Sequence, residues 1–385
     1  MRILVVPAES HPCQHSFLEE VFTKPTCAVE VEFLMRSRDG ASHLHVPWNS
    51  ARVATFPERP SNRLVKAIRA YATDLRYVPW MFRTLRRFRP DVVFVRDMTF
   101  PFFLAMLLRP FFRHAVVFQK SFPNELRWFD PDWVHAHRLP WLWVVCRRLE
   151  NTILHRLLRV ADAVIPISTW MADDLHQDWK VRRSLLHPFG LGIDRQDAMI
   201  ARRGGSVAPV RLAYVGTMGR TRRLDVLIDA FARLRDARPL DDARLTFIGG
   251  EPADIERLRD HARAHGVGEF VDFTGKVPRS EVYELLREHD VGVVYIPRDV
   301  RFRVACPTKL IECLAIGLPV VSTDACSMSA VLAEKTGAAI ITDDSAEGFA
   351  RGLSQLLQDL PAWKQQSRSE RETVLEEFDY EVIRN

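Results

Sequence analysis

The sequence lacks the features that would place it in a membrane, a disulfide-rich scaffold or a zinc finger. Its most apolar stretches, Phe100–Leu108 and Leu139–Cys146, are much shorter than the roughly 18 residues that span a bilayer. The N-terminus has only a short apolar run before polar residues, so we expect no secretory signal. The six cysteines form no CxxC pair and no metal-finger spacing, which predicts reduced thiols in a cytoplasmic protein.

The common nucleotide-binding fingerprints are also missing, because the sequence contains neither GxGxxG nor GxxxxGK[ST]. What is present is a globular composition, with 47% hydrophobic and 27% charged residues. At 385 residues, the chain is long enough for two domains.

Apolar runs of four to six residues alternate with amphipathic segments of helical length almost throughout the chain. This pattern is typical of parallel sheets covered by helices on both faces. It breaks between residues 188 and 209, a stretch with four glycines and no buried-strand signal. We therefore predict an α/β fold of two doubly wound, Rossmann-like domains, residues 1–195 and 196–365. A segment of residues 366–385 follows, which we expect to return to the first domain.

The expected strands are short runs rich in β-branched residues. In the first half they are Ile3–Val6, Val29–Leu34, Asp91–Val95, Ala115–Phe118 and Ala163–Ile167. In the second half they are Arg211–Gly216, Arg244–Gly250, Glu269–Gly275, Val291–Pro297, Leu318–Thr323 and Ala338–Ile341. The clearest helices are expected at Asn62–Phe88, Pro140–Arg159, Thr169–Asp178 and Leu224–Ala237.

The net charge of +5 is unevenly distributed along the chain. Between Arg63 and Arg113 the sequence has eleven Lys/Arg and three acids, with aromatic residues interleaved. A basic and aromatic helix suggests an anionic membrane surface. It suggests nucleic acid equally well, and a solvated helix face packed on its apolar side is a third interpretation.

Ligands of open parallel sheets bind beyond the carboxyl ends of the strands, so the loops at those ends carry the most information. The loop Gly216–Arg223 combines two glycines with Arg220 and Arg222. Glycine lets a backbone approach a ligand closely, and arginine offers paired donors to phosphate.

A second signal is the helix-like stretch that begins at Cys306 and Pro307. It places Lys309 in the first turn, where the helix dipole disfavours a cation unless an anion lies between them. Glu312 lies on the same face, one turn deeper, where it can accept hydrogen bonds from sugar hydroxyls. An exposed salt bridge between Lys309 and Glu312 explains the same spacing, and the helix alone does not separate the two interpretations.

From Pro188 to about Leu357 the sequence resembles the nucleotide-sugar-binding domain of retaining glycosyltransferases of family 4, which have the GT-B fold. The matching stretches are PFGLGID, YVGTMGRTRRLDVLIDAFARL, LTFIGGE, VDFTGKVPRSEVYELLREHDVGVV and PTKLIECLAIGLPVVST. The first domain is similar only in outline, with Glu150–Ser168 as its best match. The resemblance implies two Rossmann-like domains with an interdomain cleft, the second of which holds the donor.

Residue by residue, the resemblance places Arg222 on the donor diphosphate and Glu312 on the ribose hydroxyls. Lys276 and Val277 fall in the segment that reads the nucleobase edge. The implied donor-binding residues are Gly216, Gly219, Arg220, Arg222, Gly249, Lys276, Val277, Lys309 and Glu312. Val304 stands where the family has its first motif glutamate, so the resemblance does not indicate which sugar is bound. The chain has instead a Pro-x-Lys-x-x-Glu pattern (Pro307, Lys309, Glu312), which resembles a variant of many bacterial surface-polysaccharide transferases.

The activity implied is transfer of a sugar, with retention, from a nucleoside-diphosphate sugar to a glycan or lipid-linked acceptor. UDP is favoured over GDP as the carrier. Arg220, Arg222 and Lys309 would stabilise the charge of the leaving diphosphate. We expect no metal or other cofactor, because no acidic cluster of the strand-end loops resembles a metal site, with Asp299 and Asp324 as the acids closest to one.

In the first domain, Asp97 is the candidate catalytic residue, together with Arg222 and Lys309 of the second. His11, Lys120 and Glu125 are the candidates for the acceptor side, and for His11 a solvent-exposed loop histidine is the favoured interpretation. The expected location is the cytoplasm, with peripheral contact to an anionic inner membrane. A nucleotide-sugar epimerase or hydrolase on the same fold, or a basic nucleic-acid-binding protein, are the alternatives.

Overall fold

The computed structural model describes residues 1–8, 16–23, 29–37, 46–48, 51–57, 75–123, 141–199, 209–237 and 243–384. The chain forms two compact units, Met1–Gly190 and Leu191–Asn385, so the division lies close to the predicted boundary at residue 195. Residues from 366 onward are counted with the second unit. There the backbone N–H of Ile193 donates to Phe378 O at 2.8 Å and that of Tyr380 donates to Ile193 O at 3.0 Å.

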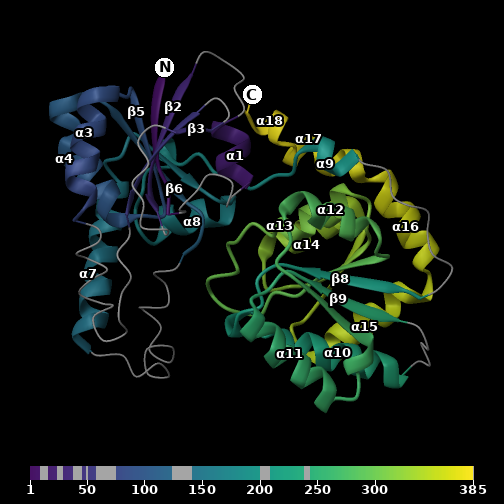
Figure 1. The fold of residues 1–385 in the computed structure, drawn as a ribbon. Helices are drawn as coiled ribbons and strands as arrows, with labels where there is room; N and C mark the ends of the chain where they lie inside the picture. Colours follow the sequence, from purple (N-terminus) through teal and green to yellow (C-terminus); the bar gives the residue numbers. More distant parts are fainter. Residues whose placement is uncertain are drawn as a thin grey trace. The chain divides into compact units, whose positions relative to one another are not determined.

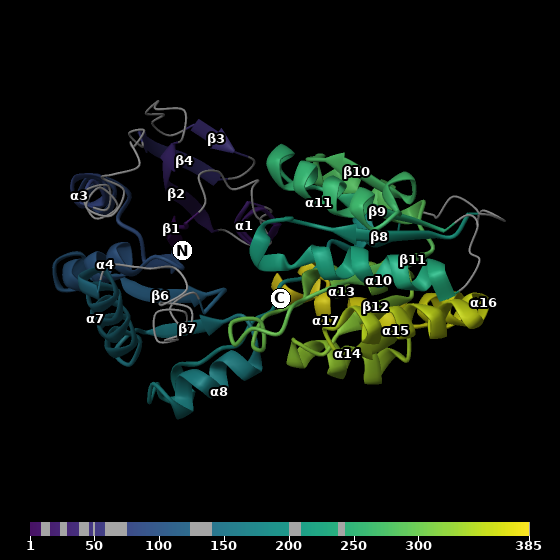
Figure 2. The ribbon, with the colours of Figure 1, turned by 90° about the horizontal axis from the view of Figure 1, so that it is seen from below.

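The first unit is built on a seven-stranded sheet with the order β3-β4-β2-β1-β5-β6-β7. Its strands are β1 (Arg2–Val6), β2 (Glu30–Ser37), β3 (Val46–Trp48), β4 (Ala51–Pro57), β5 (Val92–Arg96), β6 (Ala115–Lys120) and β7 (Ala163–Pro166). Its helices are α1 (Ser16–Phe22), α3 (Tyr77–Phe88), α4 (Thr99–Phe112), α7 (Trp141–Leu158) and α8 (Thr169–Gln177). Helices α3, α4 and α7 cover one face of the sheet, and α1 and α8 lie on the other (Figures 1 and 2).

Three elements of this unit differ from the sequence-based expectation. Strands β3 and β4 were not expected, and β3 pairs antiparallel with β4, so the sheet is parallel except at this edge. Helix α4 was not among the helices that received bounds from the sequence, and it contains Pro101 and Pro110. Pro101 lies in the first turn, where no backbone N–H is required. Pro110 lies in the last turn, where it removes one backbone hydrogen bond and only two helical residues follow.

The second unit has a six-stranded, entirely parallel sheet with the order β10-β9-β8-β11-β12-β13. Its strands are β8 (Arg211–Val215), β9 (Arg244–Ile248), β10 (Val271–Gly275), β11 (Val291–Val294), β12 (Val320–Thr323) and β13 (Ala339–Thr342). Its helices are α9 (Arg195–Met199), α10 (Leu224–Ala237), α11 (Pro252–Ala264), α12 (Arg279–Arg287), α13 (Thr308–Ala315), α14 (Ser327–Thr336), α15 (Ala346–Gln358), α16 (Leu360–Ser369), α17 (Arg371–Phe378) and α18 (Tyr380–Arg384).

Helices α10, α11 and α15 cover one face of this sheet, and α12, α13 and α14 cover the other (Figure 1). The strands are therefore buried on both faces, and their side chains form a continuous core with those of α10 and α15. Each of the six predicted strands of this half is confirmed. Because all strands are parallel, their carboxyl ends meet at one edge of the sheet, where the predicted donor-binding loops lie.

Candidate functional site

A pocket of about 260 Å³ opens at the carboxyl ends of β8, β9 and β10. Four of the predicted donor-binding residues line it, namely Gly216, Gly249, Lys276 and Val277. The volume is below the range of about 300–1,000 Å³ that is usual for a whole drug-sized ligand. The pocket therefore fits one part of a nucleotide sugar, such as a nucleobase, rather than the complete molecule.

Three glycines of the pocket lining, Gly216, Gly249 and Gly250, have backbone conformations that favour glycine. Gly216 has φ of +134° and Gly249 has φ of +112°. A Cβ on Gly249 would lie 2.7 Å from Gly216 O, so the two loops touch through their main chains. Predicted residue Gly219 differs, because its φ is −58° and no atom lies within 4 Å of a Cβ built on it.

At the rim, Lys276 Nζ lies 2.5 Å from Glu251 Oε1, with both side chains mostly exposed. Glu251 and Asp254, at the start of α11, also line the pocket and were not among the predicted residues. Their position just after β9 is the signal that would have found them.

Lys309 lies behind the pocket wall, in the first turn of α13 as the sequence predicts. Its Nζ donates to Tyr214 Oη at 3.2 Å and lies 4.8 Å from the centre of the Tyr214 ring. A Cβ on Gly216 would lie 2.5 Å from Nζ, so the glycine makes room for the lysine. Burial, with the nearby Arg222 adding to it, lowers the pKa of Lys309 to about 7.

The expected alternative of a Lys309–Glu312 salt bridge does not form among the described residues. Glu312 instead accepts a hydrogen bond from Tyr283 Oη of α12 at 3.1 Å, and Arg279 Nη2 donates to the same Tyr283 oxygen at 3.3 Å. Burial raises the pKa of Glu312, while Arg279, the Tyr283 hydroxyl and Lys309 favour its charged form. Tyr283 and Arg279 were missed by sequence reasoning, because they reach Glu312 from another helix.

The loop after β8 brings two further cations to this edge. Arg220 and Arg222 form a single 3₁₀ turn, and the Arg222 guanidinium lies 5.0 Å from the centre of the Phe302 ring. In the described part of the chain, Arg220, Arg222 and Lys309 form no ion pair with a carboxylate. Arg220 and Arg222 follow the pocket-lining residues of this loop, and Lys309 lies directly behind Gly216. Three basic side chains without carboxylate partners at one sheet edge favour a bound anion.

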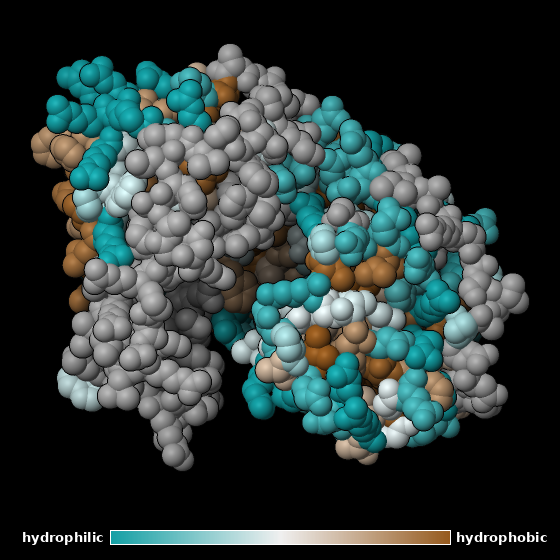
Figure 3. Space-filling view, in the orientation of Figure 1, coloured by the Kyte–Doolittle hydropathy of each residue, from teal (hydrophilic) through white to brown (hydrophobic). Residues whose placement is uncertain are grey.

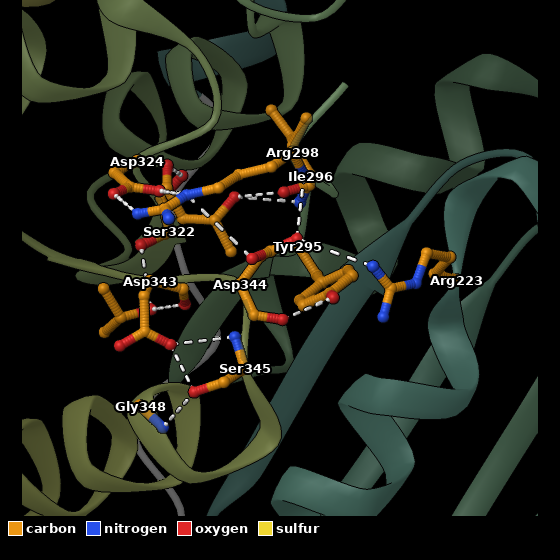
Figure 4. A network of polar contacts seen from close by, with 12 residues as sticks. Arg223, Tyr295, Ile296, Arg298, Ser322, Asp324, Asp343, Asp344, Ser345 and Gly348 are labelled. Carbon is orange, nitrogen blue, oxygen red and sulfur yellow. Dashed lines mark hydrogen bonds and ion pairs between the residues drawn. The ribbon is translucent and has the colours of Figure 1, made fainter. Parts of the chain in front are cut away.

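The other half of the strand edge is neutralised by its own side chains (Figure 4). Arg298 Nε donates to Asp324 Oδ1 at 3.0 Å, and its backbone N–H donates to Asp344 Oδ2 at 2.9 Å. Arg223 Nη1 lies 3.7 Å from Asp344 Oδ2, and Tyr295 Oη donates to Asp344 O at 2.8 Å. Acids thus gather at the ends of β12 and β13, where the sequence analysis expected few, but they face arginines.

In the first unit, Asp97 lies directly after β5 and Lys120 ends the neighbouring strand β6. Asp97 has φ of +55°, and its Oδ1 accepts from the Ser121 backbone N–H at 2.8 Å. Arg96, which is 2% exposed, donates to Gln119 Oε1 at 2.6 Å. A non-glycine residue held in the left-handed region at a strand end is typical of functional sites.

The remaining candidates of the first unit, His11 and Glu125, lie outside the described residues. Asp97 and Lys120 are therefore the two acceptor-side candidates that the structure places, and it brings them to the same edge of one sheet.

A surface of the first unit carries three apolar stripes on the packed helices α3, α4 and α7. Large side chains recur there every four residues and stand at least 40% exposed. They are Val78 and Phe82 on α3, Phe103, Leu107 and Phe111 on α4, and Trp141, Val145, Leu149 and Ile153 on α7. In Figure 3, apolar side chains line the outer edge over α4 beside the hydrophilic residues of α3.

Exposed arginines flank these stripes, and four of them form no ion pair with a carboxylate of the described chain: Arg83, Arg86, Arg113 and Arg156. None of the described helices combines the length and the hydrophobicity needed to cross a bilayer.

Two family models match the chain, one in each unit. Residues 26–192 match the glycosyl transferase 4-like domain, and residues 209–359 match the glycosyl transferases group 1. The glycogen synthase of Mycobacterium tuberculosis is 27% identical over 63% of this chain, which spans 57% of that relative's length. An Escherichia coli K12 protein, WcaL, named as a glycosyltransferase proposed for colanic acid biosynthesis, is 23% identical over 92% of this chain and 90% of its own.

Among solved structures, Anabaena Alr3699/HepE in complex with UDP and glucose aligns with a TM-score of 0.70 at 13% identity. The alignment covers 99% of this chain and 96% of that one. The likeness in structure shows the GT-B fold, and the family models account for both of its domains. The chain belongs to the GT-B-fold glycosyltransferases of family 4.

Proposed function

We propose that the protein is a retaining glycosyltransferase that moves a sugar from a nucleoside-diphosphate sugar to a glycan or lipid-linked acceptor in polysaccharide or glycoconjugate synthesis. The observation that carries the proposal is the set of three basic residues, Arg220, Arg222 and Lys309, which lack carboxylate partners among the described residues. Arg220 and Arg222 lie on the loop that continues from the pocket-lining residue Met218, and Lys309 lies behind Gly216 of the pocket wall. A diphosphate supplies the missing negative charge.

In this proposal the donor spreads over three neighbouring subsites. The nucleobase occupies the pocket beside Lys276 and Val277, and the ribose hydroxyls donate to Glu312, which Tyr283 and Arg279 hold in place. The diphosphate lies against Arg222 and Lys309. UDP is the proposed carrier, in keeping with the UDP named for the Anabaena neighbour.

The cations also carry the proposed chemistry. When the bond between the sugar and the diphosphate breaks, negative charge develops on the leaving phosphate oxygen. Preorganised guanidinium and ammonium groups stabilise that charge more than they stabilise the intact donor, which lowers the barrier. No metal is required in this scheme, because the cations do the work that a divalent ion does elsewhere.

The test is calorimetric binding of UDP and GDP to the wild type and to Arg222→Ala. Loss of a charge-assisted contact should weaken UDP binding by about 10- to 100-fold. Arg233→Ala, on the exposed side of α10, is the matched control and should bind normally. Equal binding by the wild type and Arg222→Ala would contradict the proposed site.

The reaction type is tested by incubation with a panel of UDP- and GDP-sugars, with and without acceptor glycans. A product whose new linkage keeps the donor's anomeric configuration supports the proposal. Rapid epimerisation or hydrolysis of the donor without an acceptor would favour the epimerase or hydrolase alternative.

We also propose that the apolar and basic surface of α3, α4 and α7 docks on an anionic membrane, where a lipid-linked acceptor is reached. The stripes bury apolar area in the headgroup region while arginines contact lipid phosphates. Sedimentation with vesicles tests this: Leu107→Glu with Phe111→Glu should abolish binding to phosphatidylglycerol vesicles. Val331→Glu, at another exposed apolar residue on α14, should not. Binding that survives the double substitution would overturn the assignment.

A further inference from the structure

Three potential metal ligands converge where α10 packs on α11, away from the donor pocket. Asp229 lies in the middle of α10, His261 lies in the last turn of α11, and His265 follows as its C-cap. One ligand atom from each of these residues lies within 4.8 Å of the other two. The pocket, in contrast, is lined by Asp254 at the opposite end of α11.

The geometry within the cluster is close to that of a metal site. His261 Nε2 lies 2.7 Å from Asp229 Oδ1, and His265 Nδ1 lies 3.5 Å from the same oxygen. Tetrahedral zinc with bonds of about 2.0–2.1 Å places its ligand atoms roughly 3.3 Å apart. Small side-chain rotations would bring all three atoms to that spacing, because none of the three side chains is deeply buried.

The alternative, a hydrogen-bonded Asp–His pair, accounts for only two of the three side chains. The His261 and His265 rings face each other with centroids 4.3 Å apart, and both direct a nitrogen at one carboxylate. Two protonated imidazole rings placed side by side would not stabilise each other. A divalent cation between them and the carboxylate satisfies all three groups.

We propose that Asp229, His261 and His265 bind a zinc ion, with water as the fourth ligand. Two imidazole nitrogens and one carboxylate oxygen suit Zn²⁺ and exclude Mg²⁺, which prefers oxygen ligands in octahedral geometry. The spacing of the histidines, i and i+4 on one helix, places both on one face. The ion ties α11 to α10 and acts as a structural clamp in the second unit, independent of donor binding.

Thermal unfolding tests the proposal with the full chain after EDTA treatment and buffer exchange. Zinc at about 100 times its dissociation constant should raise Tm by roughly 5–10 °C, whereas Mg²⁺ should not. The double variant His261→Ala with His265→Ala should lose the increase. His187→Ala, which removes an exposed histidine of the first unit, should retain it.

A second measurement covers the case in which the double variant is too unstable to compare. Asp229→Asn keeps an acceptor for His261 and should unfold like the wild type in EDTA, yet lose most of the zinc-dependent rise. Cobalt(II) titration of the wild type at low temperature should give visible absorption bands that disappear in His265→Ala. A zinc-dependent rise that is unchanged in the double variant and in Asp229→Asn, or cobalt bands that persist in His265→Ala, would overturn the proposal.

Discussion

Burial of the Lys309 ammonium lowers the stability of the fold, and in the proposed site the same group strengthens binding of the diphosphate. Burial lowers its pKa from 10.5 to about 7. The unfolded chain therefore binds more protons than the folded chain between about pH 7 and 10.5, and over this window the contribution of Lys309 to stability improves as pH rises. At neutral pH the charged form of the buried Lys309 carries a free-energy cost, and a bound anion would lower that cost.

We therefore expect Lys309→Met to be more stable than the wild type at pH 7, by a margin on the order of 1 kcal/mol. The same variant should bind UDP at least about 10-fold more weakly, because a charge-assisted contact is lost. Thermal unfolding and calorimetry on one preparation measure both. A variant that loses stability and keeps UDP affinity would show that Lys309 is a packing residue.

The lowered pKa also makes binding dependent on pH. Above about pH 7 the free protein loses the proton on Lys309, so UDP affinity should fall between pH 7 and 9, and binding should take up a proton. Calorimetry in buffers of different ionisation enthalpy measures that uptake. Lys309→Met serves as the reference for titration of UDP itself, and identical pH profiles for the two proteins would contradict the assignment.

Gly216 and Gly219 offer a comparison within one loop. Gly216→Ala places a methyl group against Lys309 Nζ in a backbone conformation that alanine rarely adopts, so it should displace the lysine and reduce UDP affinity by 10-fold or more. Gly219→Ala meets open space and should change stability little. Any loss of UDP binding in Gly219→Ala would then report close approach of the ligand itself.

Helix α12 supports α13 through the hydroxyl of Tyr283. Tyr283→Phe removes one hydrogen bond from the partly buried Glu312, and we expect UDP affinity to fall by roughly 3- to 10-fold. Tyr77→Phe, another fully buried tyrosine whose hydroxyl contacts Met98 Sδ in the first unit, is the matched control. Uridine, which has the ribose without the diphosphate, should show the same loss if Glu312 holds the ribose.

The elements with strong local patterns are those that sequence could predict. Helix α10, expected at Leu224–Ala237, has those bounds, and the strands of the second unit follow their β-branched runs. Strand β4 was missed because ARVATFP mixes polar residues and a proline. Helix α4 received no predicted bounds, and its sequence carries two prolines. In both, tertiary pairing and packing override the local signal.

The site follows the same rule. Gly216 was predictable from its position in a strand-end loop, and Lys276 was predicted from the family resemblance. Tyr214, Tyr283 and Arg279 were not, because each depends on which helix or strand lies beside α13. The histidines of α11 carry a visible HxxxH spacing, but the partner Asp229 comes from a different helix.

At the scale of the whole molecule, the metal-independent reaction and the proposed zinc site predict different responses to EDTA. Turnover should be unaffected by EDTA, because no metal takes part in the proposed chemistry, while Tm should fall if purified protein carries zinc. Activity and unfolding measured on the same EDTA-treated sample separate the two. A loss of turnover that Mg²⁺ or Mn²⁺ restores would overturn the metal-independent scheme.

The loops around the pocket proposed for the donor are joined through their main chains. The Gly216 N–H donates to Ile248 O, and the Gly249 N–H donates to Gly275 O, so three strand-end loops are joined by their backbones. The side chains at the rim, Lys276 and Glu251, form only an exposed pair, which contributes little to stability. Substitution of Lys276 or Glu251 should therefore leave the fold intact. Under the proposed function, these are the positions at which natural selection or protein engineering could change the nucleobase preference at the least cost to stability.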